Sequence, residues 1–286
     1  MNQVNSSTKL GIIDTLEVSH LLHLAKEVEA IGYNALWCTE HHSPDQCSNP
    51  GIAAAAVAAA TNSLRVGIGG ALAYMYSRER LASNFQLLAT LFPERIEFGF
   101  VSATPPKTIA KSLHTRIEKP FTDLVRELKS AFRVRVMQTH LEQELRIWVC
   151  GTSIRSLEAA LQNGTHFAFH DFLSTLNSYE KLAITNNFHI RKTNGSLLAI
   201  VLYGTCGQNY NDARDRWNRF YTPGLNPPPS FLGCSARCAE QIMQSCETYR
   251  PDVVLIQCME KDIHTKVDMY KKIYSALKEC GFSKDK

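Results

Sequence analysis

The sequence has 286 residues and lacks a long apolar run, a surplus of charge of one sign and any C-x-x-C pair. The most apolar segment, Gly51–Ala60, is shorter than the roughly 18 residues that a membrane span needs, so no membrane segment is expected. The net charge is only +4 and is spread along the chain, which argues against nucleic acid as a partner. Nine cysteines without such a pair, and a polar N-terminus without a secretory signal, favour free thiols and a cytoplasmic location.

Glycine-rich phosphate loops are also missing. Gly204 and Gly207 form no complete G-x-G-x-x-G fingerprint, and no G-x-x-x-x-G-K segment occurs. No internal repeat or low-complexity linker divides the chain. We therefore expect one domain over residues 1–286, with residues 1–9 as a flexible N-terminus.

The chain does contain a regular alternation of short β-like runs with helical runs, which predicts a parallel sheet covered by helices. The predicted strands are Leu10–Ile13, Ala35–Cys38, Arg65–Gly69, Arg95–Phe100, Ile147–Cys150, Phe167–His170, Leu197–Gly204 and Val253–Gln257. The predicted helices are Leu21–Ile31, Gly51–Thr61, Arg78–Leu91, Pro120–Val136, Gly151–Gln162, Ser178–Asn186, Asn211–Phe220, Ala236–Tyr249 and Ile263–Cys280. Eight strands followed by helices favour an α/β protein with a single (β/α)8 TIM barrel.

In such a barrel the functional residues directly follow the strands. Glu40, His41 and His42 follow the second strand and provide a carboxylate and two imidazoles suited to proton transfer near neutral pH. A metal site and a purely structural set of hydrogen bonds are the alternatives, although side chains of an extended E-H-H segment alternate in direction and suit a compact metal site poorly. His170 and Asp171, after the sixth strand, add a second imidazole and carboxylate.

Gly151, Thr152 and Ser153 follow the fifth strand and open a helix, with Arg155 one turn in. Free backbone N–H groups and the positive end of the helix dipole suit a phosphate there, with helix capping alone as the alternative. At the end of the third strand, Gly69-Gly70 permits close approach to the backbone.

Two cysteines and two tryptophans near strand ends are expected to pack in the interior rather than to take part in chemistry. Cys150 and Cys206 have no local base signature, so we interpret both as packing residues rather than nucleophiles. Trp37 and Trp148 are expected in the core.

The segment Glu29–His42, E-A-I-G-Y-N-A-L-W-C-T-E-H-H, resembles the "E-x-x-G-Y-x-x-x-W-x-x-E-H-H" segment of the bacterial luciferase-like flavin oxidoreductases. Pro93–Gly99 is similar to the family's "P-G-R-x-x-x-G" stretch. Trp148–Ser153 and Phe167–Phe172 are similar to segments of branches that tailor natural products. The ordered series covers most of the chain and implies a luciferase-like barrel with shortened loops.

The resemblance implies an FMN-dependent oxidoreductase or monooxygenase that uses reduced FMN, or a deazaflavin in some branches, at the barrel mouth. The residues that it implies for proton handling are Glu40, His41, His42 and His170. Those that it implies beneath the flavin ring are Gly69, Gly70 and Ala71, and those at the phosphate are Gly151, Thr152 and Ser153.

One departure from the family pattern affects the phosphate. Luciferases carry a Cys-Arg-Gly run after the fourth strand, whose Arg helps to hold the phosphate, whereas this chain has Val101-Ser102-Ala103. Ser102 therefore stands at a cofactor position without the charge. Our hypothesis is that Arg155 replaces it from the adjacent loop, since a guanidinium binds phosphate from several directions.

The resemblance also implies a small-molecule or peptide substrate, a separate reductase that supplies reduced flavin, and a homodimer formed through the early helices. One alternative is a catalytically silent flavin-binding or partner subunit of a luciferase-like heterodimer. Such a subunit has lost the phosphate-binding Arg and the long loop after the fourth strand that usually covers the flavin. Another is a metal-dependent hydrolase on the same barrel.

Overall fold

The computed structural model describes residues 8–15, 18–42, 46–104, 107–112, 119–139, 146–221 and 228–282. Residues 1–7, the larger part of the predicted flexible N-terminus, lie outside these ranges, and the first strand begins at Lys9. All described strands belong to one sheet.

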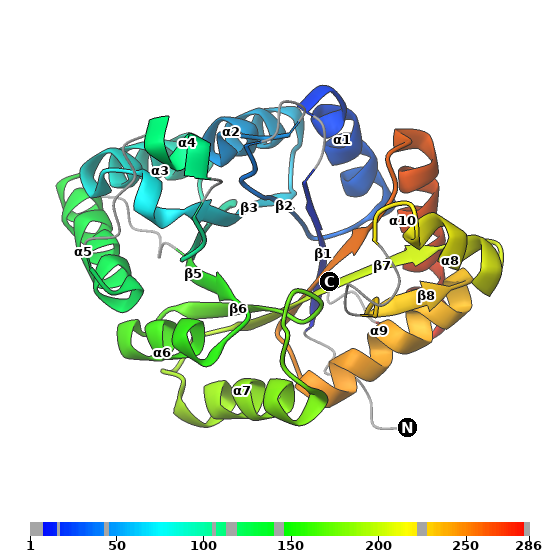
Figure 1. Ribbon diagram of the computed structural model, residues 1–286. Helices are drawn as coiled ribbons and strands as arrows, with labels where there is room; N and C mark the ends of the chain where they lie inside the picture. Colours follow the sequence, from blue (N-terminus) through cyan, green and yellow to red (C-terminus); the bar gives the residue numbers. More distant parts are fainter. Residues whose placement is uncertain are drawn as a thin grey trace.

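The sheet is parallel and closes on itself, with its strands in the centre of the molecule (Figure 1). The ring is formed by β1 (Lys9–Asp14), β2 (Ala35–Cys38), β3 (Arg65–Leu72), β4 (Ile96–Val101), β5 (Arg146–Gly151), β6 (His166–His170), β7 (Leu198–Cys206) and β9 (Val253–Cys258). Each strand pairs with the next in chain order, and β9 pairs with both β7 and β1, which closes the ring. The predicted (β/α)8 barrel is confirmed.

Helices surround this ring (Figure 1). They are α1 (Leu21–Ile31), α2 (Pro50–Ala60), α3 (Arg78–Leu91), α4 (Lys107–Ser112), α5 (Phe121–Thr139), α6 (Ile154–Asn163), α7 (Ser178–Arg191), α8 (Tyr210–Trp217), α9 (Ser235–Tyr249) and α10 (Ile263–Glu279). Within the described part of the chain, none of them has the length and apolar character to cross a membrane.

Among the α-helices and strands, two short elements were not predicted, α4 and the strand β8 (Phe231–Gly233). β8 pairs only with the outer part of β7 and lies outside the ring. Three residues are too few to show a periodic pattern, so the sequence carried no strand signal there. α4 lies in the connection after β4, of which residues 105–106 and 113–118 fall outside the described ranges.

The interior of the ring is filled by large side chains placed opposite small ones. Trp37 and Trp148 are fully buried, as predicted, and meet edge to face with ring centroids 5.2 Å apart. Trp37 occupies the space that side chains at Gly67 and Gly69 of the adjoining strand would fill. Close packing of this kind leaves no room for an added methyl group.

Two charged residues of the sequence motifs hold the loop between α2 and β3. The Glu29 carboxylate accepts hydrogen bonds from the backbone N–H groups of residues 62–64, at 2.7 to 3.1 Å. The Arg95 guanidinium donates to three carbonyl groups at the end of α2 and in the same loop, each at 3.0 Å. These contacts fix how α2 leads into β3.

The packing around Trp37 generates a stability prediction. A Cβ on Gly67 would overlap the Trp37 ring, so Gly67→Ala is expected to lower the free energy of unfolding by about 1–3 kcal/mol. Gly51→Ala in α2 is the matched control, because its Cβ would meet only Asn49 Oδ1, at 3.4 Å. Urea denaturation measures both; equal stability of the two variants would contradict this account of the interior.

Candidate active site

Glu40 lies two residues beyond the end of β2, and its side chain is completely buried at the mouth of the barrel. Its carboxylate accepts hydrogen bonds from the Leu72 backbone N–H, the Tyr76 hydroxyl and the His42 ring Nε2, each at 2.9 Å. Burial of a carboxylate is tolerated only when such donors replace water. β2, the end of β3 and the start of α3 are therefore tied together through one side chain.

The two histidines beside Glu40 point in different directions. The His42 ring faces the Glu40 carboxylate, whereas His41 is exposed at the rim of the barrel. His41 Nδ1 lies 3.1 Å from the Thr39 hydroxyl, and the His41 backbone N–H donates to the Cys47 carbonyl. Desolvation and the charge of His42 lower the pKa of His41. The structure therefore joins Glu40 and His42 through one hydrogen bond and leaves His41 beside them. Among the described residues no group of His, Cys, Asp or Glu side chains forms a metal site.

The end of β3 passes next to this pair. Its pairing with β4 shifts between Ile68 and Ala71, so Gly69 and Gly70 fall in the irregular part of the strand, and the bond between them is cis. A Cβ at Gly70 would lie 2.9 Å from the backbone of Gly99. Only glycine therefore fits at this position, two residues before the N–H that bonds Glu40.

The predicted phosphate corner lies at the start of α6. Ser153 is the N-cap residue of α6, and its backbone N–H donates to Ser156 Oγ at 3.2 Å. Ser153 therefore caps the helix, which was the alternative to phosphate binding. The Thr152 carbonyl accepts from Ser174 Oγ at 3.0 Å, which joins the corner to the loop after β6. Arg155 is exposed and has no ion pair within the described part of the chain. Ser102, at the end of β4, is also exposed.

His170 ends β6 and is buried on the inner side of the barrel. Its Nδ1 lies 3.2 Å from the Tyr203 hydroxyl, whereas its Nε2 is buried and has no hydrogen-bond partner among the residues that the structure describes. Burial lowers the pKa of His170 to about 4, so the ring is neutral at pH 7. Near pH 7 the uncharged His170 ring can therefore form a hydrogen bond through Nε2 but carries no positive charge.

Two further polar atoms on the same side of the barrel lack partners among the described residues: Thr205 Oγ1 on β7 and Gln257 Oε1 on β9. Gln257 pairs in register with Tyr203, and its Nε2 donates to Thr15 at 3.2 Å. β6, β7 and β9 are neighbours in the ring, so these atoms and His170 Nε2 lie on three adjoining strands. Buried polar atoms without partners mark places where a water molecule or ligand can bind.

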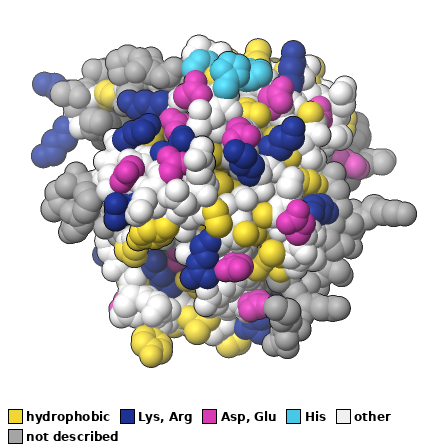
Figure 2. All heavy atoms as spheres, turned by 90° about the vertical axis from the view of Figure 1, so that its right-hand side faces the viewer, with side chains coloured by type: hydrophobic (Ala, Val, Ile, Leu, Met, Phe, Trp, Pro, Cys, Tyr) yellow, Lys and Arg dark blue, Asp and Glu magenta, His cyan; other side chains and the backbone are white. Residues whose placement is uncertain are grey.

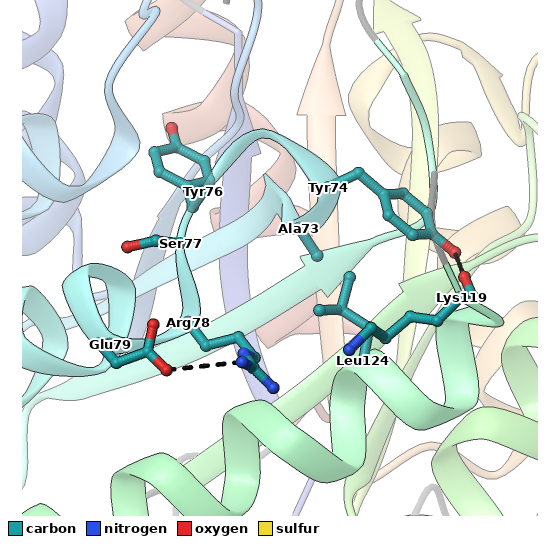
Figure 3. A pocket seen from close by; sticks show the side chains of 8 residues that line it. All are labelled: Ala73, Tyr74, Tyr76, Ser77, Arg78, Glu79, Lys119 and Leu124. Atoms are coloured by element: carbon teal, nitrogen blue, oxygen red, sulfur yellow. Dashed lines mark hydrogen bonds and ion pairs between the residues drawn. The ribbon is translucent and has the colours of Figure 1, made fainter. Parts of the chain in front are cut away.

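A cavity of about 240 Å³ opens beside Tyr76 (Figure 3). Figure 3 shows Tyr74 reaching across it to the carbonyl of Lys119, at 3.2 Å, while Arg78 approaches from the start of α3. Lys119 and Arg78 both form ion pairs with Glu127 of α5, at 2.7 and 2.5 Å. The cavity therefore combines two phenols and two paired cations, and Tyr76 connects it to Glu40.

Tyr76 and Tyr203 were missed by the sequence interpretation. Each acts on a predicted residue from far along the chain, since Tyr76 is 36 residues from Glu40 and Tyr203 is 33 from His170. No pattern in the sequence around Tyr76 or Tyr203 predicts such a contact. The shared position of Tyr203 and His170 at the carboxyl ends of neighbouring strands is the one signal that could have suggested it.

The family model of the luciferase-like monooxygenases matches residues 3–184. The chain belongs to this family. Among curated proteins, the N-acetyl-S-alkylcysteine monooxygenase of Bacillus subtilis is 30% identical over 177 residues, which cover 56% of this chain and 52% of that protein. The luciferase-like monooxygenase of Escherichia coli is 31% identical over 170 residues, which cover 53% and 49%. The chain thus spans about half the length of these curated relatives.

Solved structures of luciferase-like enzymes share the fold. Apo-MsnO8 superposes with a TM-score of 0.81 at 20% identity, covering 95% of this chain and 98% of that one. The oxygenating constituent of 3,6-diketocamphane monooxygenase from Pseudomonas putida, solved with FMN, gives 0.72 at 13% identity, covering 94% and 98%. An F420-dependent secondary alcohol dehydrogenase gives 0.64 at 13% identity, covering 94% and 99%. At these identities the likeness concerns the fold alone.

The neutral state of His170 generates a prediction about pH. In the unfolded chain this ring takes up a proton near pH 6.5, whereas in the folded protein it does so only near pH 4. The unfolded state therefore binds more protons between these values, and the free energy of unfolding is expected to fall as the pH drops through that window. The loss reaches about 3 kcal/mol for His170, and His166, whose pKa burial also lowers to about 4, acts in the same direction.

Urea denaturation of the wild type and His170→Asn at several pH values tests this. The variant is expected to show a clearly shallower decline in stability between pH 6.5 and pH 4, and His264→Gln, on the exposed start of α10, serves as the control. Parallel profiles for wild type and His170→Asn would disprove the assignment.

Proposed function

We propose that this protein is a flavin-dependent oxidoreductase that uses reduced FMN, at the C-terminal mouth of its barrel, on an organic substrate. The observation that carries the proposal is the buried Glu40 carboxylate with its three donors, because it provides a preorganised proton site where the family resemblance puts the reaction. Membership of the luciferase-like monooxygenases and the relative solved with FMN support it. When bound, the reduced flavin supplies the electrons, for oxygenation or for hydride transfer.

The residues at the start of α6 fit a phosphate. The first N–H groups of a helix have no partner within the helix, and the dipole favours an anion there. Arg155 stands in this first turn as an exposed cation without an ion pair among the described residues. We propose that Arg155 compensates for Ser102 at the position where luciferases carry an arginine. The phosphate corner then rests on Gly151, Thr152, Ser153 and Arg155.

Proton handling is assigned to Glu40 and His42, with His41 beside them. A proton that leaves His42 Nε2 crosses a single hydrogen bond of 2.9 Å to reach Glu40. Tyr76 donates to the same carboxylate oxygen, and burial and the charge of Glu40 raise its pKa, so Tyr76 stays protonated and holds the carboxylate in place. His170 contributes a neutral hydrogen bond on the opposite side of the mouth.

The finer details rest on the family resemblance. We propose a small-molecule or peptide substrate of the natural-product type, with reduced flavin supplied by a separate reductase. A deazaflavin is the alternative cofactor, in line with the F420-dependent relative. Nine cysteines without a disulfide support a reducing compartment, the cytoplasm.

Reoxidation of photoreduced FMN in air tests the function. We expect the purified protein to perturb the visible spectrum of FMN and to change the rate at which photoreduced FMN is reoxidised. Glu40→Gln is expected to bind FMN as the wild type does but to lose the rate effect roughly tenfold or more, because an amide cannot take up the proton. Arg155→Glu is expected to weaken FMN binding by roughly tenfold, the value of one charged hydrogen bond.

Glu240→Gln and Arg237→Glu are the matched controls, since these two residues form an exposed ion pair on α9, 2.8 Å apart. Absence of FMN binding in both redox states would overturn the proposal. FMN binding with an unchanged reoxidation rate would favour the catalytically silent subunit, and bound zinc without flavin would favour the hydrolase.

We further propose a homodimer formed through α2 and α3. α2 consists of Pro, Gly, Ile, Val and Ala only, yet one side of it is exposed, with Ile52 at 69%. The adjoining α3 exposes Leu87 and Leu91, at 57% and 58%, four residues apart on one helical face. Two neighbouring apolar stripes that lack a partner among the described residues suit burial against the same stripes of a second copy.

The double variant Leu87→Glu and Leu91→Glu tests this interface. Wild type is expected to sediment as a dimer at micromolar concentration, and the variant as a monomer, because charges would be buried without partners. Ile190→Glu, at a more exposed isoleucine of α7, is expected to remain dimeric. A monomeric wild type would overturn the proposal.

A further inference from the structure

Two Asn-Gly pairs, Asn163-Gly164 and Asn194-Gly195, lie at the end of the barrel opposite to the mouth. The first pair ends α6, just before β6, and the second lies in the connection from α7 to β7. In an Asn-Gly pair the backbone nitrogen of glycine can attack the asparagine side chain, because no Cβ hinders the approach. The two pairs therefore carry the same potential chemistry, and their surroundings decide whether it takes place.

The surroundings of Asn163 protect it. The residue is buried, and its Nδ2 donates to the Thr122 and Ala159 carbonyls at 3.0 and 2.9 Å. The backbone N–H of Gly164 donates to the Leu161 carbonyl at 3.2 Å. An attack would have to break the bonds of both the leaving amide and the attacking nitrogen, so the fold disfavours it.

Asn194 and Gly195, by contrast, are exposed at the centre of a β-turn. The turn is closed by the Ser196 N–H, which donates to the Thr193 carbonyl at 3.0 Å, and Gly195 has a φ of 85°. Within the described part of the chain, neither the Asn194 amide nor the Gly195 N–H has a hydrogen-bond partner. A Cβ at Gly195 would meet nothing within 4 Å. Both reacting groups are therefore unengaged, and the space around them is open.

We propose that Asn194 is a deamidation site of the folded protein, whereas Asn163 stays intact. The deprotonated Gly195 nitrogen attacks Cγ of Asn194; a C–N bond forms, the bond from Cγ to Nδ2 breaks, and Nδ2 leaves with added protons as ammonia. Water then opens the resulting five-membered succinimide ring at one of its two carbonyls. Overall, one amide and one water give one carboxyl group and one ammonia, and no electrons are transferred.

The product depends on which carbonyl the water attacks. Attack at the side-chain carbonyl gives aspartate, whereas attack at the main-chain carbonyl gives isoaspartate, which adds one atom to the backbone of the turn. A four-residue turn with an extra backbone atom loses its regular geometry. Either product also places a carboxylate two residues from Lys192, which pairs with Asp252 at 3.5 Å.

The change is expected to stay local to the turn. Acidic and basic side chains are interspersed on the surface, as Figure 2 shows for the face over α8 and α10, so one more carboxylate alters no large patch of a single sign there. The turn precedes the start of β7, whereas Tyr203 lies towards the mouth end of that strand. The inference therefore does not depend on flavin chemistry.

Peptide mapping of the folded protein during incubation in a mildly alkaline buffer tests the proposal. Trypsin cleaves after Arg155 and Lys192, so the two pairs fall on separate peptides. We expect the mass change of an amide converted to a carboxyl group at Asn194, together with labelling by an isoaspartyl methyltransferase. The reaction should accelerate with pH, because the attacking nitrogen must lose its proton. Asn209 is the internal control: it is exposed on the same peptide as Asn194, but its side chain accepts from the Asp212 N–H at 3.1 Å.

The same measurement in urea separates the effect of the fold from that of the sequence. In the unfolded chain both Asn-Gly pairs should react at similar rates, whereas in the folded protein Asn194 should react many-fold faster than Asn163. Asn194→Gln is expected to remain unmodified, since its longer side chain would have to form a six-membered ring. Equal rates at the two pairs in the folded protein would overturn the proposal, as would a folded Asn194 that stays intact while the unfolded chain reacts.

Discussion

The buried carboxylate of Glu40 is the constraint around which the mouth of this barrel is organised. A negative charge without water must receive hydrogen bonds from the protein, and here the donors come from three separate places: the backbone at Leu72, the Tyr76 hydroxyl and the adjacent His42. The irregular glycine pair at the end of β3 precedes the first of these donors by two residues. The need to supply hydrogen bonds to this buried carboxylate therefore constrains both the path of the chain after β3 and the polar contacts at the mouth.

The motif that carries the family resemblance contains both structural and chemical residues, and the structure separates them. Glu29 and Arg95 hold the loop between α2 and β3, and Trp37 fills the barrel interior over Gly67. Gly32 ends α1 in a left-handed conformation, with φ of 109°. The sequence placed Trp37 in the core, but it could not assign Glu29 and Arg95 to the loop, because their partners lie far along the chain. The alternation of strands and helices was enough for the barrel itself, since each unit has its own periodic pattern.

Contacts that join distant segments were beyond the reach of the sequence. Asp14 at the end of β1 forms a buried ion pair with Lys266 of α10, 252 residues away, with Nζ 3.0 Å from Oδ2. Tyr270 adds a hydrogen bond to the same carboxylate. No sequence pattern near Asp14 predicts Lys266 and Tyr270 as its partners. Cys206, buried at the end of β7, likewise lies beside side chains of α8 and α10 that only the fold brings together.

The two sides of the mouth differ in the polar groups that they present. On the side of β2 and β3, a carboxylate and an imidazole share one hydrogen bond, so a proton can move there without a large change in charge. On the side of β6, β7 and β9, burial keeps His170 neutral, and Thr205 and Gln257 offer only neutral polar atoms. The three buried atoms without partners on that side are uncharged, so a neutral polar group would find both donors and acceptors there. Under the proposed function, proton exchange takes place on one side of the barrel and recognition of neutral groups on the other.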